Sequence, residues 1–335
     1  MNLVVVWHAG AAFPERLEAL ANQPDVDLTL IVPQVWTKGL VQPAIASKMQ
    51  QTSFPVIALH AACQIKEVFH YYPALSETLH KLKPALLYLI EEHYSFVTFQ
   101  ALRWRERHSP KTAFAFRTWQ NIAKNYPVPF RWMERHVLKR ADGAISANQE
   151  GAAILQRKGL AGKLAIIPDG VDTRRFNIEV GLEKRVEILK RFQVQRESVP
   201  LIGFIGRLVP EKGLETLFRA FSEVSSEARL VMIGAGRMQK ELEGLSRVLG
   251  IQDSVLFADA VSRNDMPHWL AALDVLVLPS LSRPNWKEQF GRILVEAMAC
   301  GVPVIGADSG EIPQVIGDGG VVFAQGDVLA LSEWL

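Results

Sequence analysis

The feature that most constrains the fold is a set of short apolar runs that recurs along this 335-residue chain. Each run is four to six residues long, and its apolar residues mostly follow one another instead of alternating with polar ones. Strands that are buried on both faces of a parallel sheet have this pattern. The runs are Leu3–Trp7, Leu28–Val32, Ala85–Ile90, Leu164–Ile167, Leu201–Ile205, Leu230–Ile233, Val275–Leu278 and Val302–Ile305. Because helical stretches fall between them, the sequence predicts an α/β fold.

Length and composition favour two domains. A chain of 335 residues is longer than a domain of ordinary size, and 49% apolar residues supply enough material for two cores. We expect a first domain over 1–175, a linker over 176–198 and a second domain over 199–335. The chain ends inside an expected helix that begins near Asp327.

Neither a membrane span nor a disulfide framework is expected. No apolar run approaches the ~20 residues that cross a bilayer. The segment Leu3–Ala12 has no basic residues before it, so we interpret it as a first strand and loop, not as a signal peptide. Cys63 and Cys300 are too few for a framework, which favours a reducing, cytoplasmic location. The cysteines and histidines show no metal-ligand spacing, so no metal site and no cofactor are predicted.

The stretch Glu288-Gln-Phe-Gly-Arg-Ile-Leu-Val-Glu296 carries two carboxylates at either end of a predicted loop-to-helix turn. The start of a helix offers unpaired N–H groups and a partial positive charge, which suit a phosphate. Glu288 would lie in the loop, and Glu296 about one and a half turns into the helix. Such a pair of acceptors around an anion-binding helix end predicts a site for a nucleotide sugar.

Three further motifs occur in order with this stretch. They are Gly203-Phe-Ile-Gly-Arg207-Leu-Val-Pro-Glu-Lys212-Gly, Val231-Met-Ile-Gly234-Ala-Gly236 and Asp274-Val-Leu-Val-Leu-Pro-Ser280. Together the four motifs resemble those of the retaining glycosyltransferases of family 4, including their E-x7-E element. The resemblance implies the GT-B fold, in which two Rossmann-like parallel-sheet domains face each other across a cleft. It covers residues 200–323, and the N-terminal half resembles the family more loosely.

The resemblance implies transfer of a hexose from a nucleotide-diphosphate sugar, with retention and without a metal. Arg207, Lys212 and Glu288 would be the catalytic residues. The two cations would stabilise the departing diphosphate, and Glu288 would accept hydrogen bonds from the sugar. The other donor-binding residues would be Gly10, Gly206, Asp259, Phe290, Gly291, Arg292, Ile293 and Glu296. Asp259 stands where the family commonly has glycine, and Arg292 replaces an aliphatic residue.

Acceptor-binding residues are expected where strands of the first domain end, since ligands bind at the carboxyl edge of open α/β sheets. The cluster Glu91-Glu92-His93 follows one predicted strand, and we name Glu92 and His93 as candidates. Arg117 and Gln120 follow the next strand. Arg117 occupies the place where family members often have a histidine that touches the transferred sugar. Gly10 is what remains of the family's glycine-rich first loop.

Basic residues concentrate between Arg103 and Arg140, where ten Lys and Arg accompany two acidic residues. Three tryptophans, at 104, 119 and 132, are interleaved with them. This mixture suits anionic lipid headgroups, which would place the protein at the inner face of a membrane. A solvated helix face with core aromatics explains the same pattern. No motif for nucleic acid is present.

The leading hypothesis is therefore a hexosyltransferase that acts on a sugar or lipid-linked acceptor. A relative of the same fold that uses free phosphate, such as a phosphorylase, stays open. So does an inactive module that binds nucleotide sugars or membranes. Arg117 replaces the family's histidine, and we expect the chain to lack the family's usual terminal helices that cross back to the first domain.

Overall fold

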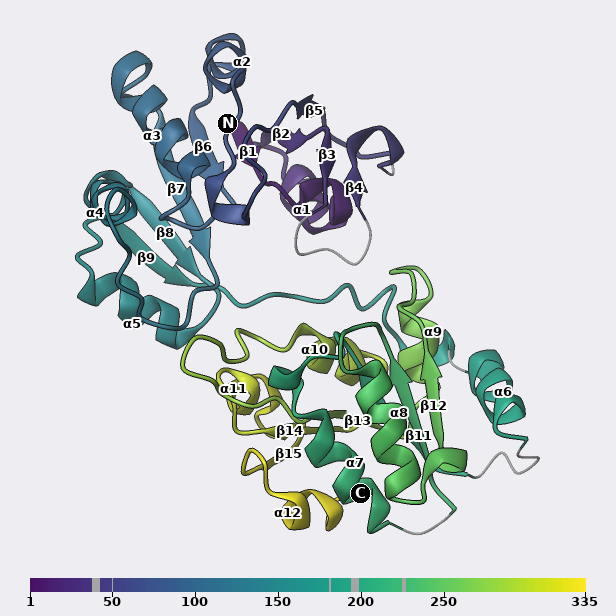
Figure 1. Ribbon diagram of the computed structural model, residues 1–335. Helices are drawn as coiled ribbons and strands as arrows, with labels where there is room; N and C mark the ends of the chain where they lie inside the picture. The colour runs from purple at the N-terminus through teal and green to yellow at the C-terminus, as the bar shows by residue number, and fades with distance from the viewer. Residues whose placement is uncertain (38–42, 50, 181, 194–198, 225–226) are drawn as a thin grey trace. The chain divides into compact units, whose positions relative to one another are not determined.

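The computed structural model describes residues 1–37, 43–49, 51–180, 182–193, 199–224 and 227–335. The chain divides into two compact units, Met1–Pro168 and Asp169–Leu335. Each unit contains a parallel β-sheet accompanied by helices, as Figure 1 shows. The prediction of two Rossmann-like α/β domains is confirmed.

The N-terminal sheet has seven strands in the order β5-β2-β1-β6-β7-β8-β9, all parallel. These strands are β1 Asn2–Val6, β2 Asp27–Pro33, β5 Val56–Leu59, β6 Leu86–Leu89, β7 Ala113–Thr118, β8 Gly143–Ser146 and β9 Lys163–Ile166. A separate antiparallel pair joins β3 Val35–Trp36 to β4 Ala44–Ile45. The helices are α1 Glu15–Ala21, α2 Leu75–Leu82, α3 Phe96–His108, α4 Phe130–Arg140 and α5 Gln149–Arg157, with single 3-10 turns η1 Gly10–Ala12, η2 Ala46–Lys48 and η3 Glu67–Phe69.

The central strand β1 shows why uninterrupted apolar runs are needed. Val4 and Val6 belong to one hydrophobic cluster, together with residues of α2 and α3. Leu3 and Val5 belong to a second cluster on the other face. Successive side chains of a strand point to opposite faces, so a strand covered on both sides must be apolar at every position.

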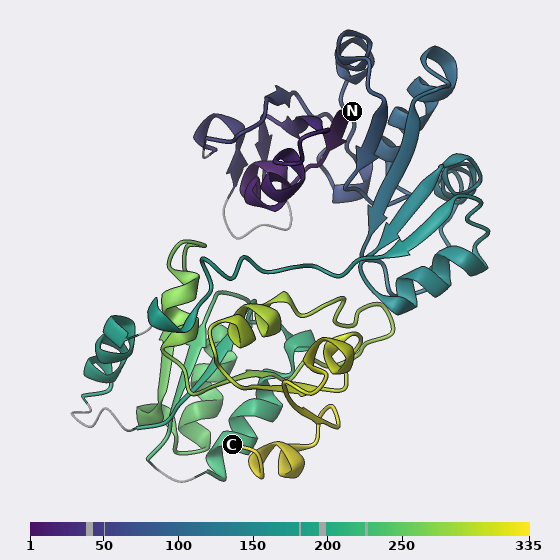
Figure 2. The same cartoon turned by 180° about the vertical axis from the view of Figure 1, so that it is seen from behind.

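The C-terminal sheet has six parallel strands in the order β12-β11-β10-β13-β14-β15. They are β10 Leu201–Ile205, β11 Arg229–Ile233, β12 Val255–Ala258, β13 Val275–Leu278, β14 Val304–Ala307 and β15 Gly320–Phe323. The helices are α6 Leu182–Arg191, α7 Leu214–Ser222, α8 Gln239–Val248, α9 Met266–Ala271, α10 Arg292–Ala299, α11 Ile312–Ile316 and α12 Val328–Ser332, with 3-10 turns η4 Ile178–Val180, η5 Pro210–Lys212 and η6 Gln252–Ser254. In Figure 2, which shows the fold from behind, α12 lies beside α7, in agreement with their contacts.

One hydrophobic cluster fills this second unit, and Phe176 is part of it. The predicted linker 176–198 therefore begins with a core residue and continues through η4 and α6, while residues 194–198 lie outside the described part. The helix expected near Asp327 is α12, where the Asp327 side chain accepts a hydrogen bond from the Ala330 N–H. Among the described residues, none of the helices combines the length and the apolar character that crossing a membrane requires.

Candidate functional site

Both sheets reverse their strand order at the same place. In each, the first strand lies beside the fourth: β1 beside β6 in the N-terminal unit and β10 beside β13 in the C-terminal unit. The helices that follow these two strands leave on opposite sides, so the loops diverge and leave room for a ligand at the carboxyl edge. Most of the predicted site residues follow these four strands, whereas Asp259 follows β12, and Arg117 and Gln120 lie at or just after the end of β7.

In the C-terminal unit, the loops after β10 and β13 meet through a glycine. Gly213 has φ of 65°, and a Cβ there would lie 1.9 Å from the carbonyl oxygen of Pro279. Leu281 also donates its N–H to the carbonyl of Glu211, at 2.9 Å. Only glycine allows this approach, because it tolerates the positive φ and carries no side chain.

This contact brings Lys212 to Glu288. Lys212 Nζ lies 2.5 Å from Glu288 Oε2, and both side chains are nearly buried, with 13% and 12% exposed. Ser280, at the end of β13, donates its hydroxyl to the same oxygen at 2.9 Å. Lys212 Nζ also stands over the Trp286 ring, 5.3 Å from its centroid. Two residues that the sequence placed in one site, 76 positions apart, are thus in direct contact.

The helix α10 begins at this same place. Gly291, with φ of 77°, precedes Arg292, the first residue of the helix. Glu296 lies one turn further and is buried, with its Oε1 3.0 Å from Arg292 Nε. Phe290 is buried beneath the turn, and Ile293 is half-buried. The arrangement combines a helix N-terminus with one carboxylate before it and one inside it, as the sequence predicted.

The remaining donor residues lie at the ends of neighbouring strands. Arg207 follows β10 with its side chain 57% exposed, and its Nη2 is 3.9 Å from Glu211 Oε1. Gly206 donates its N–H to the carbonyl of Ile233. Asp259 follows β12 and is exposed. Arg207 therefore has freedom to move toward an anion, whereas Lys212 is already fixed.

In the N-terminal unit, the reversal point is occupied by a buried acid between two imidazoles. Glu91 follows β6, and both of its oxygens lie 2.8 Å from His8 Nδ1, directly after β1. The backbone N–H of His8 also donates a hydrogen bond to Glu91 Oε1, at 2.6 Å. His70 Nε2 lies 3.9 Å from Glu91 Oε1. Trp36 packs against both imidazole rings, with centroid distances of 4.7 and 4.8 Å.

Burial and neighbouring charges together shift the pKa values of His8, His70 and Glu91. Burial alone would lower the pKa of His8, but the Glu91 carboxylate outweighs it and raises that pKa. Burial lowers the pKa of His70, which favours the neutral form of its ring. Burial alone would raise the pKa of Glu91, but the two imidazoles hold it below its ordinary value. Glu91 is thus ionised although it is only 3% exposed.

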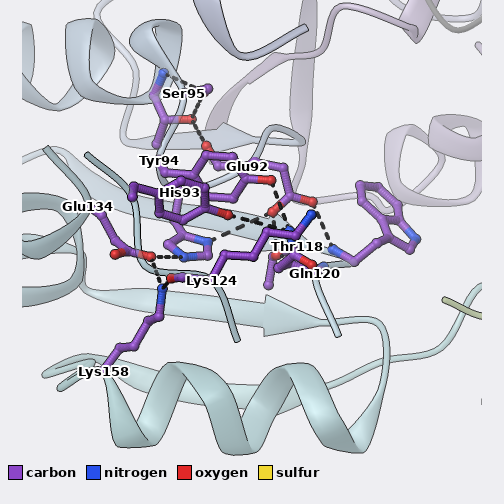
Figure 3. Close-up of polar contacts among 12 residues, drawn as sticks. Glu92, His93, Tyr94, Ser95, Thr118, Gln120, Lys124, Glu134 and Lys158 are labelled. Carbon is purple, nitrogen blue, oxygen red and sulfur yellow. Dashed lines mark hydrogen bonds and ion pairs between the residues drawn. The ribbon is translucent and has the colours of Figure 1, made fainter. Parts of the chain in front are cut away.

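Three of the four candidate acceptor residues, Glu92, His93 and Gln120, belong to a hydrogen-bonded network, drawn in Figure 3. Glu92 Oε2 accepts from the Thr118 hydroxyl at 2.5 Å, and Oε1 accepts from the Trp119 N–H at 3.2 Å. Burial raises the pKa of Glu92, although His93, Thr118 and Trp119 favour its charged form. Its side chain is 22% exposed, which leaves an edge accessible to a ligand.

His93 and Gln120 face inward. His93 Nε2 lies 3.1 Å from Glu134 Oε1, which also receives Lys158 Nζ at 2.5 Å (Figure 3). Gln120 donates to the hydroxyl of Tyr94 at 3.2 Å. Both predicted residues are buried within this network.

Arg117 and Gly10 occupy different positions from this network. Arg117 donates to the carbonyl of Ile167 at 2.8 Å and stacks over the Trp119 ring, 5.0 Å from its centroid. Gly10 is buried: it donates to the Trp7 carbonyl, and a Cβ there would lie 3.0 Å from Val32 Cγ1. Its smallness thus serves packing of the first loop on β2.

Sequence reasoning missed several members of these sites. Ser280 was visible as the end of a recognised motif, and His8 as the first polar residue after a strand. His70 and Glu134 gave no local signal, because each reaches its partner from a segment distant in sequence.

Comparison with solved structures places the fold in the GT-B class. Alr3699/HepE of Anabaena, solved with UDP, has a TM-score of 0.76 and 18% identity, over 100% of this chain and 88% of that one. A glycosyltransferase from Rickettsia africae has a TM-score of 0.74 and 15% identity, over 99% and 86%. The predicted GT-B architecture is confirmed.

Two family models, which together span most of the chain, give the family. The model described as "Glycosyl transferases group 1" matches residues 186–335, and the model described as "Glycosyltransferase Family 4" matches residues 17–175. The chain belongs to the group 1 glycosyltransferases of the family 4 type.

Curated relatives agree with this family. A 2-deoxystreptamine glucosyltransferase of Streptomyces kanamyceticus is 30% identical, over 55% of this chain and 47% of its own length. A D-inositol 3-phosphate glycosyltransferase of Xylanimonas cellulosilytica is 33% identical, over 60% and 49%. The chain thus matches about half the length of these relatives.

Proposed function

We propose that this protein transfers a hexose from a nucleotide-diphosphate sugar to an acceptor hydroxyl, with retention and without a metal at the diphosphate. The observation that carries the proposal is the Lys212–Glu288 contact beside the start of α10. At the reversal point of one sheet, this contact sets a cation and an acid beside a helix N-terminus. The cation and the helix N-terminus suit a diphosphate, and the acid suits the hydroxyls of its sugar.

The chemistry follows from where charge develops. When the glycosidic bond to the diphosphate breaks, negative charge grows on the phosphate oxygens, and fixed cations stabilise this state more than the ground state. Lys212 is held in position by Glu288 and Trp286, so little reorganisation is required of it. Arg207 is exposed and can approach the diphosphate with its planar fork of donors.

The two acids would hold the ends of the donor. Glu288 lies in the loop and would accept hydrogen bonds from the sugar hydroxyls. Glu296, inside the helix, would accept those of the ribose, in exchange for part of its contact with Arg292. We assign no protein nucleophile, and the leaving phosphate would take the acceptor proton.

For the acceptor we propose a sugar, a cyclic polyol or a lipid-linked form of either. The names of relatives support this class: they include enzymes for 2-deoxystreptamine and inositol phosphate, and a phosphatidylinositol monomannoside mannosyltransferase. Glu92, with an exposed edge and a raised pKa, is the N-terminal residue best suited to receive an acceptor hydroxyl.

Titration calorimetry with UDP, GDP and ADP, followed by incubation with the matching hexose donors, tests this function. We expect one nucleotide to bind, slow hydrolysis of its sugar in water, and faster consumption with an acceptor from the proposed class. Proton NMR of the product gives the anomeric configuration, and added EDTA should leave the rate unchanged. Binding without any donor consumption would favour the inactive module, and phosphate-dependent turnover would favour a phosphorylase.

We also propose that α4 carries the protein to anionic membranes. Trp132 is 56% exposed and Val128, just before the helix, is 76% exposed. The exposed basic residues of the helix are Arg131, Arg135, Lys139 and Arg140. By contrast, Trp104 is buried in the core, and Arg103 and Arg105 are paired with Glu106 and Asp142.

Flotation with anionic and neutral vesicles tests the membrane surface. We expect salt-sensitive flotation with anionic vesicles only, lost when Arg131, Arg135 and Lys139 are changed to glutamine. The matched control changes Lys66, Lys81 and Lys111 of the same unit. Equal flotation of both triple variants would exclude α4 as the membrane surface.

A further inference from the structure

A second cluster of chemically active side chains lies outside the donor site. His8, His70 and Glu91 come from three separate segments: the loop after β1, the residue after η3 and the loop after β6. One ligand atom from each can be chosen so that all three lie within 4.8 Å of one another. Among the residues that the structure describes, no other three histidines, cysteines or acids bring their ligand atoms this close together.

We propose that His8, His70 and Glu91 bind one divalent transition-metal ion, with zinc as the best fit to two imidazoles and a carboxylate. Zinc takes nitrogen and oxygen ligands at about 2.0–2.2 Å in tetrahedral geometry, so its ligand atoms stand about 3.3 Å apart. The distances from Glu91 to His8 Nδ1 and His70 Nε2, 2.8 and 3.9 Å, lie on either side of that value.

The state of His70 is the observation that points to a cation. Its Nδ1 lies 2.6 Å from the carbonyl oxygen of Glu67, so Nδ1 carries the proton and donates it. Nε2 then presents a lone pair toward the Glu91 carboxylate, and two acceptors face each other at 3.9 Å. Among the described residues, none makes a hydrogen bond to this nitrogen, which is fully buried. A cation between the two acceptors removes that conflict.

The surroundings have the form of a metal site. Histidine ligands commonly donate a hydrogen bond from the N–H of their second ring nitrogen to a backbone carbonyl, as His70 Nδ1 does to Glu67, and this fixes the ring. Trp36 packs on both imidazoles and limits their rotation. His8 is 20% exposed, which gives an entry path, whereas His70 and Glu91 are closed to solvent.

Three protein ligands leave a fourth tetrahedral position for water or for an oxygen of a bound molecule. All three belong to the N-terminal unit, and none of them is a residue to which the donor chemistry is assigned. The proposal therefore stands apart from the proposed donor chemistry and survives its failure.

Metal binding is measured on the full chain after treatment with a chelator. Zinc is titrated in competition with a chromophoric chelator, and cobalt(II) is added separately to record its visible absorption. We expect one ion per chain and the intense absorption of a four-coordinate cobalt site. The variants His8→Gln, His70→Gln and Glu91→Gln should each bind zinc at least tenfold more weakly and lose that absorption.

The matched control is His60→Gln, an exposed histidine just after β5, which should bind zinc like the parent. Loss of the buried His70 can unfold the protein, so the result for the partly exposed His8 decides the test. Circular dichroism checks the folding of each variant. Zinc should also raise the melting temperature of the parent and of His60→Gln but not of His8→Gln. Binding that persists in all three variants, for example at the neighbouring rings of His80 and His108, overturns the proposal, as does absence of binding.

Discussion

The two units place different chemistry at the same topological position. In the C-terminal unit, the reversal point between β10 and β13 holds a lysine, two acids and glycine turns, one of which lets the two loops touch. In the N-terminal unit, the reversal point between β1 and β6 holds an acid between two imidazoles, packed under tryptophan. The fold supplies the position, and side chains decide what can bind there.

The difference also explains why one half of the chain is easier to interpret. A site made from glycine turns and a helix start is built from short stretches of fixed spacing, because backbone geometry builds each stretch. Residues 206–213 and 288–296 are such stretches, although they lie far apart in sequence. A site made by buried side chains that meet across a sheet has no such requirement. Motifs are therefore clear in residues 200–323, whereas the N-terminal cluster is assembled from distant segments.

The largest effect is expected for Lys212→Ala. Loss of the fixed cation should lower kcat/KM by roughly 10²–10³-fold, because the growing charge on the diphosphate loses a preorganised partner. It also leaves Glu288, now without Lys212, in a nearly buried position. Steady-state kinetics with the best donor give the value. Lys81→Ala, which removes an exposed lysine paired with Glu77, is the control and should leave the rate unchanged.

A smaller effect is expected for Glu296→Gln. A hydrogen bond to a charged group contributes about 1.5–3 kcal/mol, so the Kd of the nucleotide should rise about 10–100-fold. Calorimetry with the nucleotide alone separates this from turnover. Glu215→Gln, at an exposed position of α7, should change nothing. Equal nucleotide affinity in both variants would remove Glu296 from the site. The C-terminal reversal point would then differ less from the N-terminal one in what it can bind.

Gly213→Ala tests the contact between the loops. The new Cβ would meet the Pro279 carbonyl at 1.9 Å in a residue with φ of 65°, so we expect a loss of about 1–3 kcal/mol or more in the free energy of unfolding. Gly244→Ala, inside α8 with open space at its Cβ, should instead stabilise by about 0.5–1 kcal/mol. Urea unfolding measures both, and equal signs would contradict the proposed role of Gly213.

The smallest effect concerns the buried network of the N-terminal unit. Burial would raise the pKa of Glu134, but hydrogen bonds from His93 and Lys158 hold it below the ordinary 4.5. Because the folded pKa is the lower one, its stabilisation is complete above about pH 4.5 and is lost as the pH falls through the lowered value. Glu134→Gln should cost about 1–2 kcal/mol near pH 6, and this cost should shrink as the pH falls below 4.5 and through the lowered pKa.

Thermal melts between pH 3 and pH 7 compare Glu134→Gln with the parent protein. Glu77→Gln, at an exposed pair on α2, is the control and should follow the parent closely. A difference between Glu134→Gln and the parent that stays constant with pH would mean that Glu134 contributes through packing instead of charge.

Much of the fold could be predicted from the sequence, because strands buried on both faces leave an unambiguous apolar signature. Leu201–Ile205 and Val275–Leu278 were predicted with the bounds that the structure gives them. The contact of Lys212 with Glu288 also follows once both lie after neighbouring strands. Gln120 and His93 were harder, because a polar residue at a strand end can face a ligand or the core, and burial decides between them only in three dimensions.

The meeting of Gly213 with the Pro279 carbonyl has a mechanical consequence. The two loops touch main chain to main chain, without side chains between them, and they share the Leu281–Glu211 hydrogen bond. Neither loop can therefore shift without moving the other. A displacement of Ser280 should therefore also displace Lys212. The two loops should thus behave as one rigid unit, so that the space beside them changes only when both loops move together.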